Sequence, residues 1–174
     1  MLPDLKTNRL RLRNFTLADA PRVCRLAGTE KVSRYTLNIP HPYEEKMAYE
    51  WIDSQQMRWE KRTEFVYAII LQSESDLIGA IGLHEMDNAA GELGYWIGES
   101  YWGNGYCAEA AEAIIQFSFS KLGLQRIQAQ HIAENAASGE VLKKINMHYL
   151  GNNIQKDRYG EDAKMELYEI QNHK

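Results

Sequence analysis

The chain has 174 residues, of which 25% are charged and 44% hydrophobic, and its net charge is −4. This length suits one domain over residues 1–174, and the mild acidity excludes the basic footprint of a nucleic-acid-binding or membrane-surface protein. No apolar run is long enough to span a membrane, no signal-peptide core follows Met1, and Cys24 and Cys107 stand apart as free thiols, so we expect a cytoplasmic protein.

The first third of the chain predicts one strand and two helices. Leu10 and Leu12 alternate with arginines, which indicates a strand with one solvent-exposed face. Thr16 and Asp19 have the spacing of a capping box, which marks the start of a helix. The expected elements are a strand over 6–14, a helix over 17–27, a loop over 35–42 and a second amphipathic helix over 43–59.

Three β-rich runs follow, and polar turns separate them. They predict two hairpins that lead into a central strand. In that strand Leu93, Tyr95 and Ile97 alternate with Glu92 and Trp96, a period of two. The expected strands cover 65–71, 77–86 and 92–97.

A glycine-bearing turn connects the central strand to a long helix. Gly98, Gly103 and Gly105 interrupt the chain, and from Tyr106 the pattern is that of a helix buried around most of its circumference. Such a turn presents free N–H groups and a positive dipole end to one point, which suits a phosphate. By itself a glycine pair before a helix is more often only a tight turn.

The last part of the chain predicts a strand over 125–132, a helix that starts in 134–138, and two closing strands over 149–158 and 164–170. The predicted order of elements is therefore β-α-α-β-β-β-α-β-α-β-β. No repeat, linker or low-complexity segment interrupts it. This order describes a mixed α/β domain.

Three separate stretches resemble one family. The sequence Tyr-Trp-Gly-Asn-Gly-Tyr-Cys-Ala-Glu-Ala over 101–110 closely resembles the acetyl-CoA pyrophosphate loop of the GNAT N-acetyltransferases, and it matches best their branch that acetylates ribosomal proteins at serine or alanine. The opening Thr-x-Arg-Leu-x-Leu-Arg and the pair Asn135-x-x-Ser138 are similar to the same branch. The family pattern Gln/Arg-x-x-Gly-x-Gly/Ala falls on Trp102, Gly105 and Cys107, so both ends depart from it.

The resemblance implies a single-domain GNAT fold, in which helices flank a mixed and mostly antiparallel sheet. It also implies acetyl-CoA as the cofactor, with its pantetheine arm along the end of the central strand and on Asn135. Backbone amides of the turn would hold the pyrophosphate. The cofactor-binding residues implied are Tyr95, Trp96, Ile97, Trp102, Gly103, Asn104, Gly105, Tyr106, Cys107, Ala108, Asn135 and Ser138.

The catalytic roles implied fall on two residues. Many members place a tyrosine seven residues after the asparagine to protonate the CoA thiolate, and here that position is Leu142. Ser138 is the remaining hydroxyl on that turn, so it is assigned to protonate or hydrogen-bond the thiolate. Glu92 is the preferred general base, acting on the amine through a water, and His84 is the second candidate. The histidines show no metal-ligand spacing, so we expect no metal.

The resemblance implies direct transfer of acetyl from acetyl-CoA to a primary amine within a ternary complex. A protein N-terminus of the ribosomal-protein type is the first acceptor to consider. Amino sugars, polyamines and antibiotics are alternatives within the same branch, and a non-catalytic acyl-CoA sensor is another. Dimerisation is common in the family. A phosphate-loop or Rossmann nucleotide site is disfavoured because neither glycine motif is present.

Overall fold

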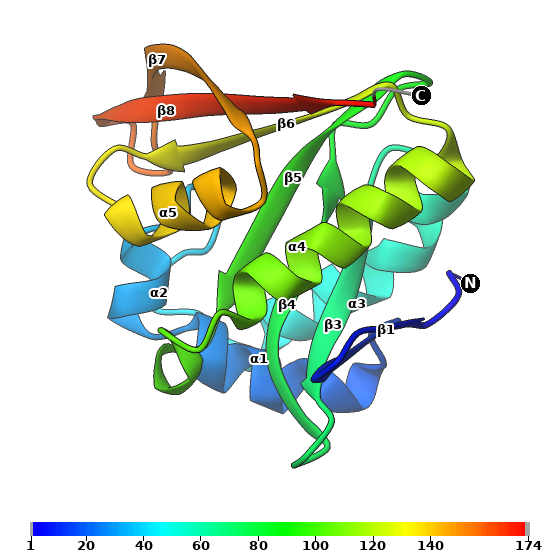
Figure 1. Ribbon diagram of the computed structural model, residues 1–174. Helices are drawn as coiled ribbons and strands as arrows, with labels where there is room; N and C mark the ends of the chain where they lie inside the picture. The colour runs from blue at the N-terminus through cyan, green and yellow to red at the C-terminus, as the bar shows by residue number, and fades with distance from the viewer. Residues whose placement is uncertain (1, 173–174) are drawn as a thin grey trace.

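The computed structural model describes residues 2–172, in which eight strands form one sheet in the order β1-β2-β3-β4-β5-β6-β8-β7 (Figure 1). Neighbouring strands are antiparallel except β5 and β6, which are parallel. The strands are β1 (Leu5–Lys6), β2 (Leu10–Arg13), β3 (Phe65–Leu71), β4 (Asp76–His84), β5 (Ala90–Ile97), β6 (Arg126–Ile132), β7 (His148–Lys156) and β8 (Asp162–Gln171). The helices are α1 (Ala20–Ala27), α2 (Glu30–Arg34), α3 (Glu45–Glu60), α4 (Tyr106–Phe117) and α5 (Ala136–Lys144), with short helical turns η1 (Leu17–Asp19), η2 (Glu99–Tyr101) and η3 (Ser118–Leu122).

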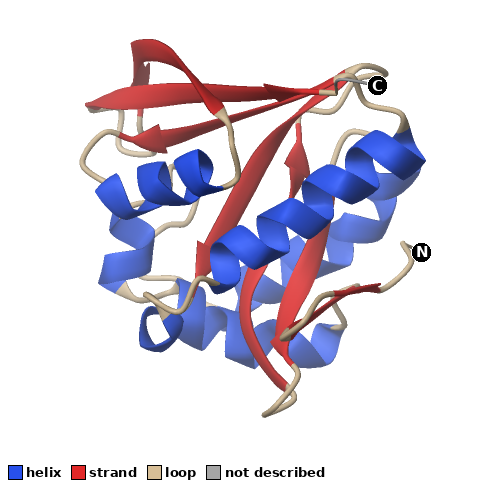
Figure 2. Cartoon of the chain, in the orientation of Figure 1, coloured by secondary structure: helices blue, strands red, loops and turns tan. Residues whose placement is uncertain are grey.

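Helices cover both faces of the sheet (Figure 2). The larger hydrophobic cluster lies between α4 and one face, where Tyr67, Ile114 and Ile127 are fully buried. A smaller cluster lies between the other face and helices α1 and α3, and it includes Ala68 and Ile70 of β3. Because strand side chains alternate between faces, odd-numbered residues of β5 such as Tyr95 point toward α4, while Trp96 packs with the α1 and α3 cluster.

The predicted order of elements is confirmed, with two additions. The expected strand over 6–14 is in fact a hairpin of β1 and β2, because residues 7–9 form its turn. The short helix α2 lies before the expected loop, and the Thr29 side chain caps it by accepting from the Val32 N–H at 3.3 Å. In the described range 2–172 we find no helix with the length and apolarity needed to cross a bilayer.

Strands β5 and β6 separate after a short parallel pairing (Figure 1). They pair from Ala90–Leu93 on β5 to Arg126–Ala129 on β6. Beyond that point β5 continues beside β4 as far as Ile97, and β6 continues beside β8 as far as Ile132. The second half of β5 is therefore paired with β4 on one side, and its other side is unpaired and faces the opening between β5 and β6.

Ile114 tests whether the core under α4 carries the stability of the fold. We expect Ile114→Ala to lower the free energy of unfolding by about 2–5 kcal/mol, because the side chain is fully buried and its loss leaves a cavity. Urea denaturation measures this difference. The matched control is Ile154→Ala on β7, where the side chain is 68% exposed and we expect a cost below about 1 kcal/mol. Equal costs at the two positions would contradict the assignment of the core.

Candidate active site

The glycine turn leads directly into the first turn of α4. Gly103 and Gly105 have φ values of 78° and 76°, a left-handed conformation that favours glycine, and Gly105 is the N-cap of the helix. No side chain caps this end, so the first N–H groups of α4 point out of the helix without a partner from the cap. The predicted phosphate-binding turn is thus present as a conformation of the backbone.

Side chains of the turn hold its shape instead of pointing at a ligand. The Trp102 indole Nε1 donates to the Ile97 carbonyl at 2.6 Å, which ties the turn to the end of β5. The Asn104 amide donates to the carbonyls of Tyr101 and Trp102, each at 3.1 Å. Burial raises the pKa of the Cys107 thiol, which disfavours its nucleophilic thiolate form. Because these side chains bond within the protein, the backbone amides of the turn are the groups left to bind an anion.

The β1–β2 hairpin clamps the turn, an interaction that sequence reasoning missed. Glu109, in the first turn of α4, accepts from the Thr7 hydroxyl at 2.6 Å, from the Arg9 backbone N–H at 2.8 Å and from Arg9 Nε at 2.7 Å. Arg9 Nη1 donates to the Asn104 carbonyl at 2.9 Å. Burial alone would raise the pKa of Glu109, but the hydrogen bonds from Thr7 and Arg9 lower it. The sequence did contain a signal for this contact. Thr7 and Arg9 belong to the Thr-x-Arg motif, and Glu109 belongs to the Glu-Ala motif.

The unpaired side of β5 presents backbone groups to the opening between β5 and β6. The Gly98 N–H donates to the Ile78 carbonyl of β4 at 2.9 Å. In an antiparallel ladder the backbone groups of successive residues point to alternate sides, so those of Ile97 and Tyr95 point away from β4. The N–H and C=O of Tyr95 and the N–H of Ile97 therefore face the opening. The backbone of Trp96 faces β4 instead, so it cannot take the predicted cofactor contact through its own amide.

Tyr95 places its hydroxyl beside Ser138, which the sequence reading did not foresee. The two hydroxyl oxygens are 2.7 Å apart, and the Tyr95 O–H also lies 3.3 Å from the Ser138 carbonyl. Asn135 Oδ1 accepts from the Ser138 N–H at 3.2 Å, so this asparagine is the N-cap of α5. Leu142, at the family's tyrosine position, is completely buried in the core. The tyrosine hydroxyl near Ser138 is thus supplied by Tyr95 of the central strand β5, not by position 142 of α5.

A polar row crosses the opposite face of the sheet. Glu64 precedes β3 opposite His84 of β4, which pairs in register with Glu92 of β5. Glu64 Oε2 accepts from Arg58 Nη1 at 2.5 Å, and its Oε1 lies 3.4 Å from His84 Nδ1. Burial of Glu64 alone would raise its pKa, but His84 and Arg58 together lower it. Glu64 was not predicted, because a single carboxylate before a strand carries no motif.

The predicted base Glu92 lies on the same face as His84. Gln130 Nε2 donates to Glu92 Oε1 at 3.0 Å, and Gln155 Nε2 of β7 donates in turn to Gln130 Oε1 at 2.6 Å. The His84 ring lies over Gly94, where an added Cβ would come within 2.8 Å of it. Both candidate bases therefore lie on adjacent strands and face the side of the sheet that α1 and α3 cover.

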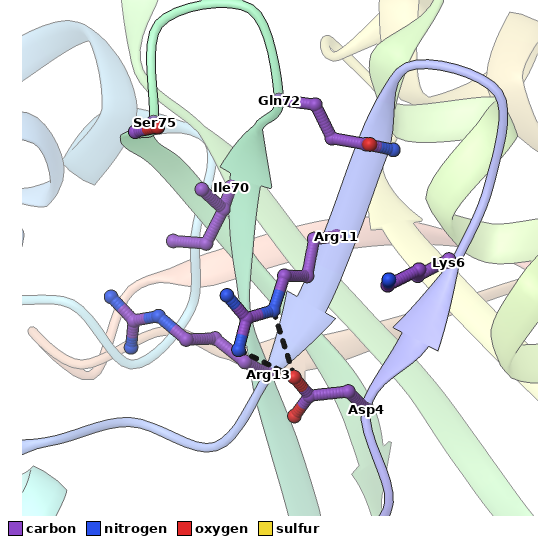
Figure 3. Close-up of a pocket in the computed structure, with 7 residues that line it drawn as sticks. All are labelled: Asp4, Lys6, Arg11, Arg13, Ile70, Gln72 and Ser75. Atoms are coloured by element: carbon purple, nitrogen blue, oxygen red, sulfur yellow. Dashed lines mark hydrogen bonds and ion pairs between the residues drawn. The ribbon is translucent and has the colours of Figure 1, made fainter.

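A cavity of about 550 Å³ is lined by none of these residues but by Asp4, Lys6, Arg11, Arg13, Ile70, Gln72 and Ser75 (Figure 3). Arg11 lines it and pairs through Nε and Nη2 with Asp4 at 2.8 and 2.7 Å, so this cation is already compensated. In residues 2–172 we find no cluster of three or more His, Cys, Asp or Glu able to hold a metal. The candidate site is therefore the opening beside β5 with the turn at its end.

Comparison with known proteins identifies the class. Residues 9–148 match the acetyltransferase (GNAT) domain family, and the chain belongs to it. The chain is similar to the uncharacterized N-acetyltransferase YoaA of Bacillus subtilis, with 30% identity over 147 residues that cover 83% of this chain and 82% of YoaA. It is an acetyl-CoA-dependent N-acetyltransferase.

Solved structures share the fold across the whole chain. The GNAT acetyltransferase of Bacillus anthracis superposes with a TM-score of 0.84 and 25% identity, covering 97% of this chain and 98% of that one. RimL, a ribosomal L7/L12 α-N-protein acetyltransferase solved in complex with coenzyme A, superposes with a TM-score of 0.87 at 16% identity, covering 97% and 98%. The GNAT fold expected from the sequence is confirmed.

Glu64 makes stability depend on pH. Its pKa is lower in the folded protein than the usual 4.5, so it stabilises the fold above that pH and the contribution is lost as pH falls through the folded pKa. We expect Glu64→Gln to cost about 1–3 kcal/mol at pH 7 and progressively less below pH 4.5. Urea denaturation across this range measures it. The exposed Glu112→Gln is the control, and a cost for Glu64→Gln that stays constant down to pH 3 would contradict the mechanism.

Proposed function

We propose that this enzyme transfers acetyl from acetyl-CoA to the N-terminal amine of a protein, with residues 1–174 acting as one catalytic domain. The observation that supports it best is the free edge of β5. This edge offers the backbone groups of Tyr95 and Ile97, and the proposed phosphate-binding turn follows directly after it in the chain. The hydroxyls of Tyr95 and Ser138 also meet at this strand. An extended thioester needs this combination of an edge, an anion site and a group that stabilises the leaving sulfur.

The residues fit the cofactor in two places. The backbone amides of 103–108 lie at the N-terminus of α4, where the helix dipole favours an anion. The Tyr95 and Ile97 N–H groups would pair with the amides of an extended arm, as an added strand does. When bound, acetyl-CoA supplies the acetyl group as an activated thioester. The N-cap role of Asn135 leaves its Nδ2 available to the same arm.

The pair of Tyr95 and Ser138 would stabilise the thiolate by hydrogen bonding, not by proton transfer. Burial raises the pKa of Tyr95 above its usual value of 10, whereas a thiol has a pKa of about 8.5. Giving up the phenolic proton to a thiolate would therefore be uphill. In the proposed arrangement the Tyr95 hydroxyl would donate to Ser138 Oγ, 2.7 Å away, and the Ser138 proton would then be free to point at the departing sulfur.

Glu92 is our proposed general base, because it lies on the face opposite the hydroxyl pair and, among residues 2–172, its carboxylate takes one hydrogen bond, from Gln130. Its second oxygen can accept from a water that contacts the amine. His84 contacts Glu64, so we assign it a structural role beside Glu92. It stays the second candidate for the general base. An amine held next to the thioester gains most of its rate from proximity.

The choice of acceptor rests on similarity and on charge. RimL, which shares the fold, is a ribosomal L7/L12 α-N-protein acetyltransferase, and the mild acidity of this chain suits a cationic acceptor. A cytoplasmic location would follow from such a substrate. Amino sugars, polyamines and antibiotics remain the alternative acceptors. A thiol-release assay with acetyl-CoA against N-terminal peptides and these small amines decides between them, because turnover only with small amines would refute the protein acceptor. Tight acetyl-CoA binding with no turnover on any amine would favour the sensor.

Ser138→Ala and Tyr95→Phe test the hydroxyl pair. We expect each to lower kcat by about 10–100-fold, because Ser138→Ala removes the hydrogen bond to the developing thiolate and Tyr95→Phe removes the hydrogen bond that orients Ser138. The KM for acetyl-CoA should change little. The double variant should cost no more than about twice the larger single loss, since both act through one oxygen. Ser120→Ala and Tyr149→Phe, both at exposed positions, are the controls, and full activity of Ser138→Ala would refute the assignment.

Glu92→Gln tests the base through its pH dependence. We expect kcat/KM to fall by about 100-fold near pH 7, because the protonated amine must lose a proton before it attacks. The loss should shrink as pH rises past about 8, the usual pKa of an α-amino group, because the free amine then needs no base. Initial rates from pH 6 to 9.5 measure it. An equal loss at every pH would point to a structural effect, for which Glu112→Gln is the control.

A further inference from the structure

The hydrogen bond to Glu92 does not come from the residue opposite it on β6. In the parallel pairing of β5 and β6 the register partner of Glu92 is Gln128, yet the Gln128 amide donates to Glu169 of β8 at 3.2 Å. The donor to Glu92 is Gln130, two residues further along β6, with its Nε2 3.0 Å from Oε1. Because the two strands run in the same direction, this bond directs the carboxylate toward the end where they separate.

Gln130 lies just past the last pairing of the two strands. The final pair is Leu93 with Ala129, so Gln130 is the first residue of β6 beside the opening. The side chains of Gln130 and Glu92 are half-buried, whereas Gln128 is exposed. A hydrogen bond that is partly shielded from water is stronger than an exposed one. The contact between Gln130 and Glu92 is thus the one able to hold the carboxylate at the opening.

A second glutamine fixes which end of the Gln130 amide faces Glu92. Gln155 Nε2 of β7 donates to Gln130 Oε1 at 2.6 Å, so that oxygen is held away from the carboxylate. A freely rotating amide could turn its oxygen toward Glu92, and two acceptors would then face each other. Arg158, three residues after Gln155, donates through Nη2 to the Ser33 hydroxyl at 2.9 Å and ties the β7–β8 hairpin to α2. The orientation of the Gln130 amide is therefore set from the far edge of the sheet.

The amide gives Glu92 a direction without a counter-ion. Among residues 2–172 the carboxylate of Glu92 forms no ion pair, since the neighbouring His84 contacts Glu64. A cation in the place of Gln130 would stabilise the ionised carboxylate and weaken it as a proton acceptor. A neutral donor fixes one oxygen and leaves the other to accept from a water.

We propose that Gln130 is a positioning residue for acetyl transfer and that Gln155 holds it in place. This rests on the proposed function, in which Glu92 accepts the proton of the amine through a water. Gln130 transfers no proton. Its amide fixes Oε1 of Glu92, so that Oε2 receives a proton from the water while the water takes one from the amine. Loss of Gln130 therefore slows removal of this proton and leaves the binding of acetyl-CoA unchanged.

Gln130→Leu tests the proposal, with Gln128→Leu as the matched control on the same face of the same strand. We expect Gln130→Leu to lower kcat/KM for the amine about tenfold near pH 7, with the KM for acetyl-CoA within about twofold of wild type. Gln128→Leu should change either constant by less than about twofold, because its side chain is exposed. Initial rates of thiol release measure both.

Gln155→Leu is the second variant, and it leaves the packing of β6 intact because β7 is the edge strand of the sheet. We expect it to lower kcat/KM about threefold, since Gln130 keeps its donor but loses its fixed orientation. Circular dichroism spectra like that of wild type show that each variant is folded. A Gln155→Leu enzyme with wild-type kcat/KM would refute the role of Gln155.

A double-mutant cycle with Glu92→Gln separates positioning from general damage. We expect Gln130→Leu to cost less than about twofold in the Glu92→Gln background, because it acts only through that carboxylate. The loss from Gln130→Leu should also shrink as pH rises past about 8, where the amine is already free of its proton. Initial rates of the four enzymes from pH 6 to 9.5, as for Glu92→Gln alone, measure both effects.

Three results would overturn the proposal: wild-type kcat/KM in Gln130→Leu, a loss that multiplies that of Glu92→Gln, or a loss that is equal at every pH. Each of them leaves Glu92 as the base if Glu92→Gln is impaired. Full activity of Glu92→Gln is a different result. It would refute the proposed base itself, and the positioning role of Gln130 with it.

Discussion

The early end of the parallel pairing between β5 and β6 is the constraint on which the site depends. The two strands share only Ala90–Leu93 and Arg126–Ala129 before each follows its other neighbour. A strand that loses its partner inside a fold leaves N–H and C=O groups that need new partners, since an unpaired buried group costs about 1–3 kcal/mol. The Trp102 indole satisfies the last of these, the Ile97 carbonyl. The groups before it remain for a ligand.

The turn after β5 works only because distant parts of the chain hold it. Its two left-handed glycines give it the curvature, but they also make it flexible in isolation. Glu109 prevents this by joining the first turn of α4 to Thr7 and Arg9, about a hundred residues earlier in the chain. The burial of α4 against the sheet fixes the other side. The N-terminal hairpin therefore supports the glycine turn in space, although it is remote in sequence.

The sequence predicted the parts of this protein that local patterns encode. The alternation in β5 and the glycines of the turn are both local, and each was found where expected. Asn135 was expected to contact the pantetheine arm, and the structure shows it as the N-cap of α5. Contacts between distant segments were missed, because nothing local marks them. Tyr95 was assigned to cofactor binding through its strand, yet its hydroxyl meets Ser138 across 43 residues. Trp96 was assigned to the same edge, but the alternation of the ladder turns its amide to β4. The roles of the predicted residues in catalysis stay predictions.

In the proposed mechanism, the two faces of β5 divide the chemistry between them. Odd-numbered residues carry the hydroxyl pair toward α4 and α5, while even-numbered ones carry Glu92 toward the face where His84 and Glu64 lie. Acetyl transfer to an amine needs a proton acceptor and a stabiliser of the leaving sulfur, and these two groups would neutralise each other if they were in contact. Placing them on opposite sides of one strand keeps a carboxylate away from a developing thiolate. The alternation of side chains in a single strand is then sufficient to separate the two functions.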